Sequence, residues 1–186
     1  MTSLTLIKKH IVANDGTLPC ERVVGVQEPN ASAVFEYGFS SAEFKDTVEQ
    51  DIEMGSFSAE ALAEFYRRVY HQSPEERPYH NCHLFAWYLA GAVDTLQRYD
   101  SYDAEFEDLY TDWFAPGCTY VIKDSTGKLA HSLVGTGQIG ETLSVTGDYN
   151  PMIIMSTRAL MNLYDGVRIR RTIPLRATVI DDKPAQ

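Results

Sequence analysis

A cysteine and a histidine in this sequence have the surroundings that nucleophilic catalysis requires. Cys82 stands at the expected first turn of an apolar helix, and His131 opens a short apolar segment that ends at Gly137. The unpaired N–H groups and the dipole of a helix N-terminus favour a thiolate, and the same N–H groups can hold the oxyanion of a tetrahedral intermediate. A thiol also needs a base within hydrogen-bond reach, which His131 could supply. The two residues therefore predict acyl transfer through a thioacyl intermediate.

A third polar residue is expected to hold the imidazole in one tautomer. The segment 142–146 should pair with the strand that His131 opens, which would bring Ser144, Thr146 or Asp148 beside the ring. Asp148 is the best hydrogen-bond acceptor of the three, although its carboxylate could instead cap the turn in which it lies. We expect Asp148 to orient His131, with Ser144 as a supporting residue.

Helices are predicted where apolar residues recur at a spacing of three and four. One such helix runs from Asn81 or Cys82 to about Arg98, and its apolar stripe begins at Cys82 and packs inward. Pro74 and Pro78 separate it from the helix before it. The other predicted helices cover residues 42–53, 59–70 and 103–113.

Short β-branched or apolar segments between turn residues predict strands. These segments cover residues 4–12, 22–27, 33–39, 118–123, 130–135, 142–146, 152–155 and 167–173. A small helix is expected from Ser156 or Thr157 to Tyr164. Helices followed by strands that should pair antiparallel indicate an α+β fold, and 186 residues suit a single domain.

The order of these parts resembles the NlpC/P60 and CHAP branch of the papain-like cysteine hydrolases. That family places its cysteine at the start of a helix, then a Pro-Gly turn into a strand, then a strand that opens with histidine and ends in Gly-x-Gly, then a strand with a polar third residue. The matching segments are Asn81 to Ala86, Pro116 to Ile122, His131 to Gly137 and Thr142 to Asp148. The resemblance covers about residues 78–150.

The resemblance implies a papain-like catalytic core over about residues 78–175 and an extended N-terminal addition over residues 1–60. It implies a cysteine amidase or peptidase that needs no cofactor and acts on a peptide or amide substrate, with Cys82 as nucleophile and His131 as base. Tyr79 or Gln72 would help to line the oxyanion site. The chain departs from the family where Asn-Cys-His-Leu replaces Asp-Cys-Ser-Gly, and where Cys118 follows the Pro-Gly turn in place of an acid.

A zinc site is one alternative to a catalytic cysteine. His71, His80, Cys82 and His83 lie within a short segment, and zinc takes thiolate and imidazole ligands. The spacing fits no familiar zinc motif, and a further ligand would have to come from His131 or from the acidic residues.

A non-catalytic module is the other alternative. A degenerate papain-like fold could serve as a binding or immunity-type protein, and the 11 tyrosines of this acidic chain could line a groove for a partner.

Charge and composition exclude several classes of protein. A formal net charge of −10 argues against binding to a nucleic-acid backbone. The sequence has no apolar run long enough for a membrane span and no signal-peptide pattern at its N-terminus. Three cysteines, an odd number, at Cys20, Cys82 and Cys118 argue against a disulfide framework. We expect a cytoplasmic protein with no membrane partner.

Overall fold

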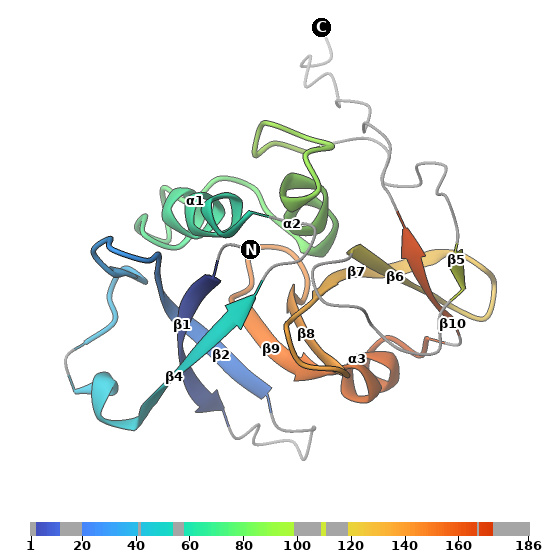
Figure 1. Ribbon diagram of the computed structural model, residues 1–186. Helices are drawn as coiled ribbons and strands as arrows, with labels where there is room; N and C mark the ends of the chain where they lie inside the picture. The colour runs from blue at the N-terminus through green and yellow to red at the C-terminus, as the bar shows by residue number, and fades with distance from the viewer. Residues whose placement is uncertain are drawn as a thin grey trace, which may run out of the picture.

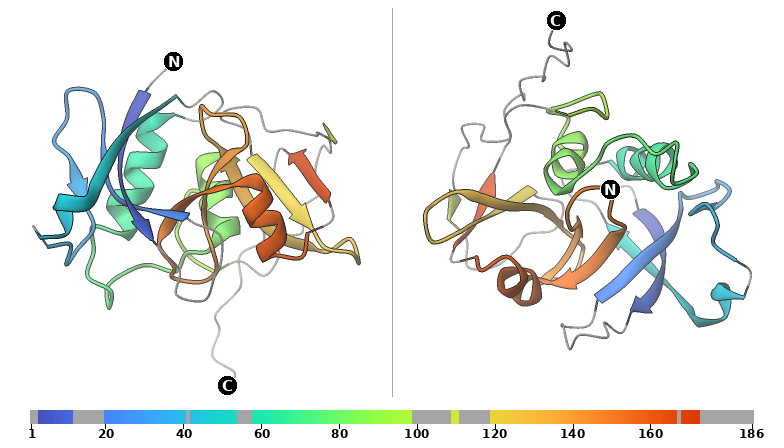
Figure 2. Two further views of the ribbon diagram at one scale, coloured as in Figure 1. Left: turned by 90° about the horizontal axis from the view of Figure 1, so that it is seen from below. Right: turned by 180° about the vertical axis from the view of Figure 1, so that it is seen from behind.

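The computed structural model describes residues 3–11, 20–40, 42–53, 58–98, 109–110, 119–166 and 168–172. In these ranges the chain forms three α-helices on a mainly antiparallel sheet, which confirms the predicted α+β class. Figure 1 shows α1 and α2 on one side of the sheet and α3 on the other. The views from below and from behind in Figure 2 agree with this arrangement.

The helices are α1 (Ala59–Val69), α2 (Cys82–Leu89) and α3 (Thr157–Leu163), and a short 3-10 helix covers Glu43–Asp46. The strands are β1 (Ser3–Ile11), β2 (Cys20–Gln27), β3 (Val34–Phe35), β4 (Thr47–Glu53), β5 (Leu109–Tyr110), β6 (Thr119–Lys123), β7 (Leu129–Gly135), β8 (Glu141–Val145), β9 (Met152–Ser156) and β10 (Arg168–Thr172). The strand order is β4-β1-β2-β9-β8-β7-β6-β10-β5, with β3 paired to β2.

The N-terminal strands belong to the same sheet as the strands of the second half. Strand β2 pairs with β9 through Glu21 opposite Ile154 and Arg22 opposite Ile153. The largest apolar cluster also joins residues of β1 and β2 to residues of α1, α2, β7 and β8. The expected N-terminal addition of residues 1–60 is therefore connected to residues 78–175 by one sheet and one core.

Most predicted elements are found within a few residues of their expected bounds. Ser58 caps α1 by accepting a hydrogen bond from the backbone N–H of Ala61 at 2.9 Å. Ser156 caps α3 in the same way through the N–H of Ala159 at 3.2 Å. Strands β6 to β9, which contain the expected histidine strand, follow one another as antiparallel neighbours.

The predicted helix over residues 42–53 is wrong. The segment forms the 3-10 helix and then β4, which pairs along its full length with β1. A mixed amphipathic pattern suggested a helix, but Thr47, Val48 and Ile52 are β-branched, and Ile52 becomes buried opposite Leu4 on β1. Pairing with a distant strand therefore overrides the local helix preference.

Helix α2 is shorter than the predicted helix over residues 81–98. It ends at Leu89 with Ala90 as its C-cap, and Gly91 then takes a positive φ of 74°. A glycine in this left-handed conformation commonly ends a helix. The chain after Gly91 still packs inward, because Val93 is buried in one apolar cluster with Trp87 of α2.

Two layers of core lie on the two faces of the sheet. Helices α1 and α2 cover the first face, where Phe65 and Phe85 pack edge to face with ring centroids 5.1 Å apart. Helix α3 covers the second face, where Leu160 packs with Leu133 of β7 and Ile122 of β6. Strand β7 thus contributes side chains to both cores.

The predicted helix over residues 103–113 is wrong where the structure describes it, because Leu109–Tyr110 form strand β5 and pair with β10. The rest of that segment, the Pro116-Gly117 turn and Cys118 lie outside the described residues. Among the helices that are described, none is long and apolar enough to cross a membrane.

A substitution at Gly166 would test how closely the end of α3 packs against the sheet. A Cβ at this position would lie 2.1 Å from Cγ2 of Ile122. We expect Gly166→Ala to lower the free energy of unfolding by about 1–3 kcal/mol in urea titration, because overpacking displaces the helix end. Ile122→Leu removes Cγ2 and should restore part of the loss in the double variant. A Gly166→Ala protein as stable as wild type would contradict this packing.

Candidate functional site

The first turn of α2 places Cys82 at a helix start that is firmly fixed. Asn81 is the N-cap in extended conformation, and its Oδ1 accepts a hydrogen bond from the N–H of Leu84 at 2.9 Å. Leu84, Phe85 and Trp87 have no exposed surface, so the helix is held by apolar packing along its length. The turn that carries Cys82 is therefore defined by both a cap and a core.

The thiol of Cys82 lies among backbone N–H groups. The N–H groups of Ser132, His83 and Cys82 itself interact with the sulfur and lower the pKa of the thiol. Burial has the larger effect, because Cys82 is only 6% exposed, and it raises the pKa of the thiol to about 11. The negative charge of Asp148 also raises it. In this conformation Cys82 is a neutral thiol at pH 7.

The imidazole of His131 is fully buried on β7. Its ring stacks on Tyr164, with ring centroids 4.1 Å apart and an interplanar angle of 15°. Neither ring nitrogen has a hydrogen-bond partner among the described residues. Burial, and then the charge of His83, lower the pKa of His131 to about 3. The ring is therefore neutral at pH 7, and its polar atoms are unpaired.

Strand alternation explains why Cys82 and His131 form no hydrogen bond in the described structure. Side chains of successive strand residues point to opposite faces. Ser132 and Val134 point toward α1 and α2, because Ser132 contacts His83 and Val134 belongs to the core under these helices. His131 points to the face that α3 covers. The sulfur therefore meets the backbone of Ser132, the residue after the histidine, and not the imidazole.

Tyr164 contacts the imidazole of His131 and is also influenced by the charge of Cys82. Burial, and then the charge of Cys82, raise the pKa of the Tyr164 hydroxyl. Because the same tyrosine stacks on His131, it lies near both expected catalytic residues. The catalytic roles of Cys82 and His131 stay predictions.

Asp148 is placed differently from its expected position beside His131. Its Oδ1 accepts a hydrogen bond from the hydroxyl of Tyr79 at 3.2 Å, and within the described part of the chain no side chain forms a hydrogen bond with His131. Ser144 lies on the same sheet face as His131, because Leu143 pairs with Val134 and so faces the opposite side. The Ser144 hydroxyl is buried and likewise has no hydrogen-bond partner in the described ranges. The register therefore places Ser144, and not Asp148, on the face of the sheet that holds the imidazole.

The two residues expected at the oxyanion site differ in their surroundings. Tyr79 precedes the cap of α2 and accepts a hydrogen bond from Nδ2 of Asn81 at 2.9 Å. Gln72 lies half-buried in the turn after α1, and the described structure gives it no hydrogen bond to Cys82 or His131. Tyr79 is thus connected to the start of α2, and Gln72 is not.

His83, a second histidine beside Cys82, was predicted only as a ligand of the alternative zinc site and not as a partner of the catalytic residues. Nδ1 of His83 lies 2.8 Å from the hydroxyl of Ser132, which is fully buried. The sequence did contain a signal, because a serine directly after the strand histidine must face the opposite side of β7. The His83–Ser132 pair lies on the face of the sheet that α2 covers, which is also the side of the Cys82 thiol.

The alternative zinc site is not assembled by the described residues. The ring nitrogens of His80 lie 3.0 Å from the carbonyl of Pro78 and 3.2 Å from that of Asn150. Nδ1 of His71 lies 2.9 Å from the carbonyl of Phe35. Within the described ranges, no three or more His, Cys, Asp or Glu side chains are grouped as metal ligands.

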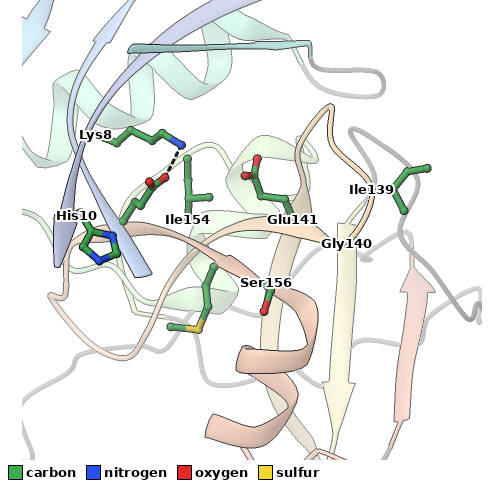
Figure 3. Close-up of a pocket in the computed structure, with 9 residues that line it drawn as sticks. Lys8, His10, Ile139, Gly140, Glu141, Ile154 and Ser156 are labelled. Atoms are coloured by element: carbon green, nitrogen blue, oxygen red, sulfur yellow. Dashed lines mark ion pairs between the residues drawn. The ribbon is translucent and has the colours of Figure 1, made fainter. Parts of the chain in front are cut away.

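A pocket of about 420 Å³ lies away from Cys82, between the β1–β2 hairpin, the β7–β8 turn and β9 (Figure 3). Its charged groups already have partners. Lys8 pairs with Glu21, and Glu141 accepts hydrogen bonds from Gln50 at 2.8 Å and from Thr136 at 2.7 Å. The pocket therefore presents no unpaired buried charge to a ligand.

Comparison of this chain with protein-family models, curated proteins and solved structures finds no match.

The buried imidazole predicts sensitivity to acid. The pKa of His131 is about 3 when folded and 6.5 in the unfolded reference, so the unfolded chain binds more protons between these pH values. The free energy of unfolding should therefore fall by about 1.4 kcal/mol per pH unit as the pH drops below 6.5. Burial also lowers the pKa of His80, which adds to the loss.

His131→Phe keeps a ring against Tyr164 and removes the titration. Urea unfolding between pH 7 and pH 4.5 should show a shallower loss of stability for His131→Phe than for wild type. If the free energy of unfolding fell by the same amount between pH 7 and pH 4.5 in wild type and in His131→Phe, the burial of a neutral imidazole would be contradicted.

Proposed function

We propose that this protein is a cysteine hydrolase that cleaves an amide or peptide bond, with Cys82 as the nucleophile. The observation that carries the proposal is the position of the Cys82 sulfur, at the first turn of α2 among three backbone N–H groups and beside the strand that carries His131. The same N–H groups are the type of donor that stabilises a thiolate and then an oxyanion.

The proposed reaction proceeds in two steps. His131 takes the proton of the thiol, and the sulfur attacks the carbonyl carbon to form a C–S bond. The C–N bond then breaks as the imidazolium gives its proton to the leaving amine. Water, deprotonated by the imidazole, attacks the thioester, which releases the carboxylic acid and returns the proton to the thiolate. No cofactor is needed for either step.

The described conformation is closed to this reaction. The thiol is 6% exposed and the imidazole has no exposed surface, so a substrate carbonyl cannot approach either group. Both groups are also neutral, because burial shifts the pKa of each toward its uncharged form. The proposal therefore requires a second conformation, in which the sulfur is exposed and the imidazole reaches it.

We also propose that the fold is papain-like. The order of elements supports this, because a cysteine helix (α2) precedes an antiparallel run of strands whose second member, β7, contains the histidine. Helix α2 packs on β7, as the resemblance implies for the pair of elements that hold the catalytic residues. The continuation of the sheet from β9 into β2, β1 and β4 is an addition to that arrangement.

A non-catalytic binding module on a degenerate papain-like fold is the second candidate. It is favoured by one specific observation: burial moves the pKa of Cys82 up to about 11 and that of His131 down to about 3. A thiolate–imidazolium pair needs shifts in the opposite directions.

A reducing compartment such as the cytoplasm suits either function. Cys20 and Cys82, the two cysteines in the described part of the chain, are both free thiols. The substrate or partner is a peptide or a small amide in this proposal, since a net charge of −10 disfavours nucleic acid.

The pH profile of Cys82 alkylation distinguishes the two functions. If the hydrolase conformation is populated, iodoacetamide should modify Cys82 below pH 7 in wild type, because imidazolium holds the thiolate there. This component should disappear in His131→Ala. His83→Ala is the matched control, since it removes the other histidine near the sulfur, and it should keep the low-pH component. Peptide mapping separates Cys82 from Cys20 and Cys118.

A single rise in alkylation rate toward pH 11, identical in wild type and His131→Ala, would contradict the hydrolase and favour the binding module. Loss of the low-pH component in His83→Ala alone would contradict the role assigned to His131.

A further inference from the structure

We propose that Tyr79 and Asp148 are positioning residues, which hold the N-cap of α2 and thereby fix the place of the Cys82 sulfur. The proposal departs from the expected roles of both residues, since the sequence placed Tyr79 at the oxyanion site and Asp148 beside His131. Its importance for catalysis rests on the function proposed above, whereas the positioning itself does not.

The hydroxyl of Tyr79 uses its full hydrogen-bonding capacity. A phenol has one O–H to donate and two lone pairs to accept with. Tyr79 donates to Oδ1 of Asp148 at 3.2 Å and accepts from Nδ2 of Asn81 at 2.9 Å. It also takes part in a hydrogen bond with Arg98, whose guanidinium lies 5.4 Å from the centroid of the tyrosine ring. We call these four residues the Tyr79 network.

The network fixes the orientation of the capping amide. Asn81 uses Oδ1 to accept from the N–H of Leu84 and Nδ2 to donate to Tyr79, so only one of its two amide orientations satisfies both bonds. Without the Tyr79 hydroxyl, the Nδ2 group would lose its partner in the described structure. Because Cys82 is the next residue, the hydroxyl acts on the thiol through the first turn of the helix.

Asp148 links this turn to the loop between β8 and β9. The loop is bound to the segment before α2 at two further points, through the N–H of Tyr149 to the carbonyl of His80 at 2.9 Å and through His80 Nε2 to the carbonyl of Asn150 at 3.2 Å. The hydroxyl of Tyr70 donates to the same carbonyl of Asn150 at 2.8 Å. A movement of this loop would therefore act on the start of α2.

Charge gives Asp148 a second effect on the thiol. The titratable groups that surround Cys82 are Asp148 from the loop, His83 from α2, His131 from β7 and Tyr164 after α3. The negative charge of Asp148 opposes formation of the thiolate. Removal of the charge and removal of the hydrogen bond should therefore have different results, which makes the proposal testable.

Amide hydrogen exchange at Leu84 measures the cap directly. Tyr79→Phe and Asp148→Ala both break the network without changing the helix sequence, and each should raise the exchange rate of the Leu84 N–H by roughly fivefold. Asp148→Asn keeps an oxygen that accepts from Tyr79, so it should restore nearly the wild-type rate. The Ala61 N–H, which Ser58 caps on α1, is the internal control and should be unchanged.

Alkylation of Cys82 above pH 8 provides the second measurement, because it does not depend on a charged His131. We expect Tyr79→Phe and Asp148→Ala to change the alkylation rate severalfold, as the sulfur moves relative to the N–H groups of the turn. Asp148→Asn should shift the titration of the thiol to lower pH while the cap stays intact. Tyr149→Phe, which keeps the ring that packs on Tyr79 and His80, should match wild type in both measurements.

The proposal is overturned if Leu84 exchanges at the wild-type rate in both Tyr79→Phe and Asp148→Ala. It is also overturned if Leu84 and Ala61 accelerate equally, because that result would mean a general loss of stability. Absence of alkylation below pH 7 would count against the hydrolase function alone and would leave these outcomes unchanged.

Discussion

The packing of the first turn of α2 against β7 determines the chemistry of the site, because it decides how much water reaches the Cys82 sulfur. Three backbone N–H groups favour the thiolate at this position, but burial outweighs them and raises the pKa of the thiol to about 11. At that value only about one molecule in ten thousand carries a thiolate at pH 7. Any reaction at Cys82 therefore depends on an opening of this contact, and the loop that carries Asp148 adjoins it.

The same contact explains the division of β7 between two environments. Ser132 faces the helices and contacts His83, whereas His131 faces α3 and stacks on Tyr164. An imidazole whose two nitrogens have no partner among the described residues reduces the stability of this buried conformation. A hydrolase would use the ring in its open conformation, whereas a binding module would not need it. On the same face of the sheet, the buried hydroxyl of Ser144 is a second polar group without a partner among the described residues.

Local patterns in the sequence predicted the helix starts, because these depend on hydrogen bonds between residues that are close in the sequence. Asn81 and Ser156 were expected at helix starts, and each accepts a backbone hydrogen bond there. Strand β4 was missed because its stability comes from pairing with β1, which sequence alone does not show. Within the site, the position of Cys82 at a helix start was predictable, but the face of His131 was not. It depends on strand register and on which helix covers which face.

The capture of an acyl group on Cys82 would test the central claim most directly. The protein would be treated with an activated phenyl ester, quenched in acid and analysed by intact mass and peptide mapping. The account predicts a thioester on Cys82 in wild type, with release of one phenolate for each acyl group, and no adduct at this residue in Cys82→Ser or His131→Ala. Acyl groups found only on lysines or on Cys20, at equal levels in wild type and His131→Ala, would contradict it.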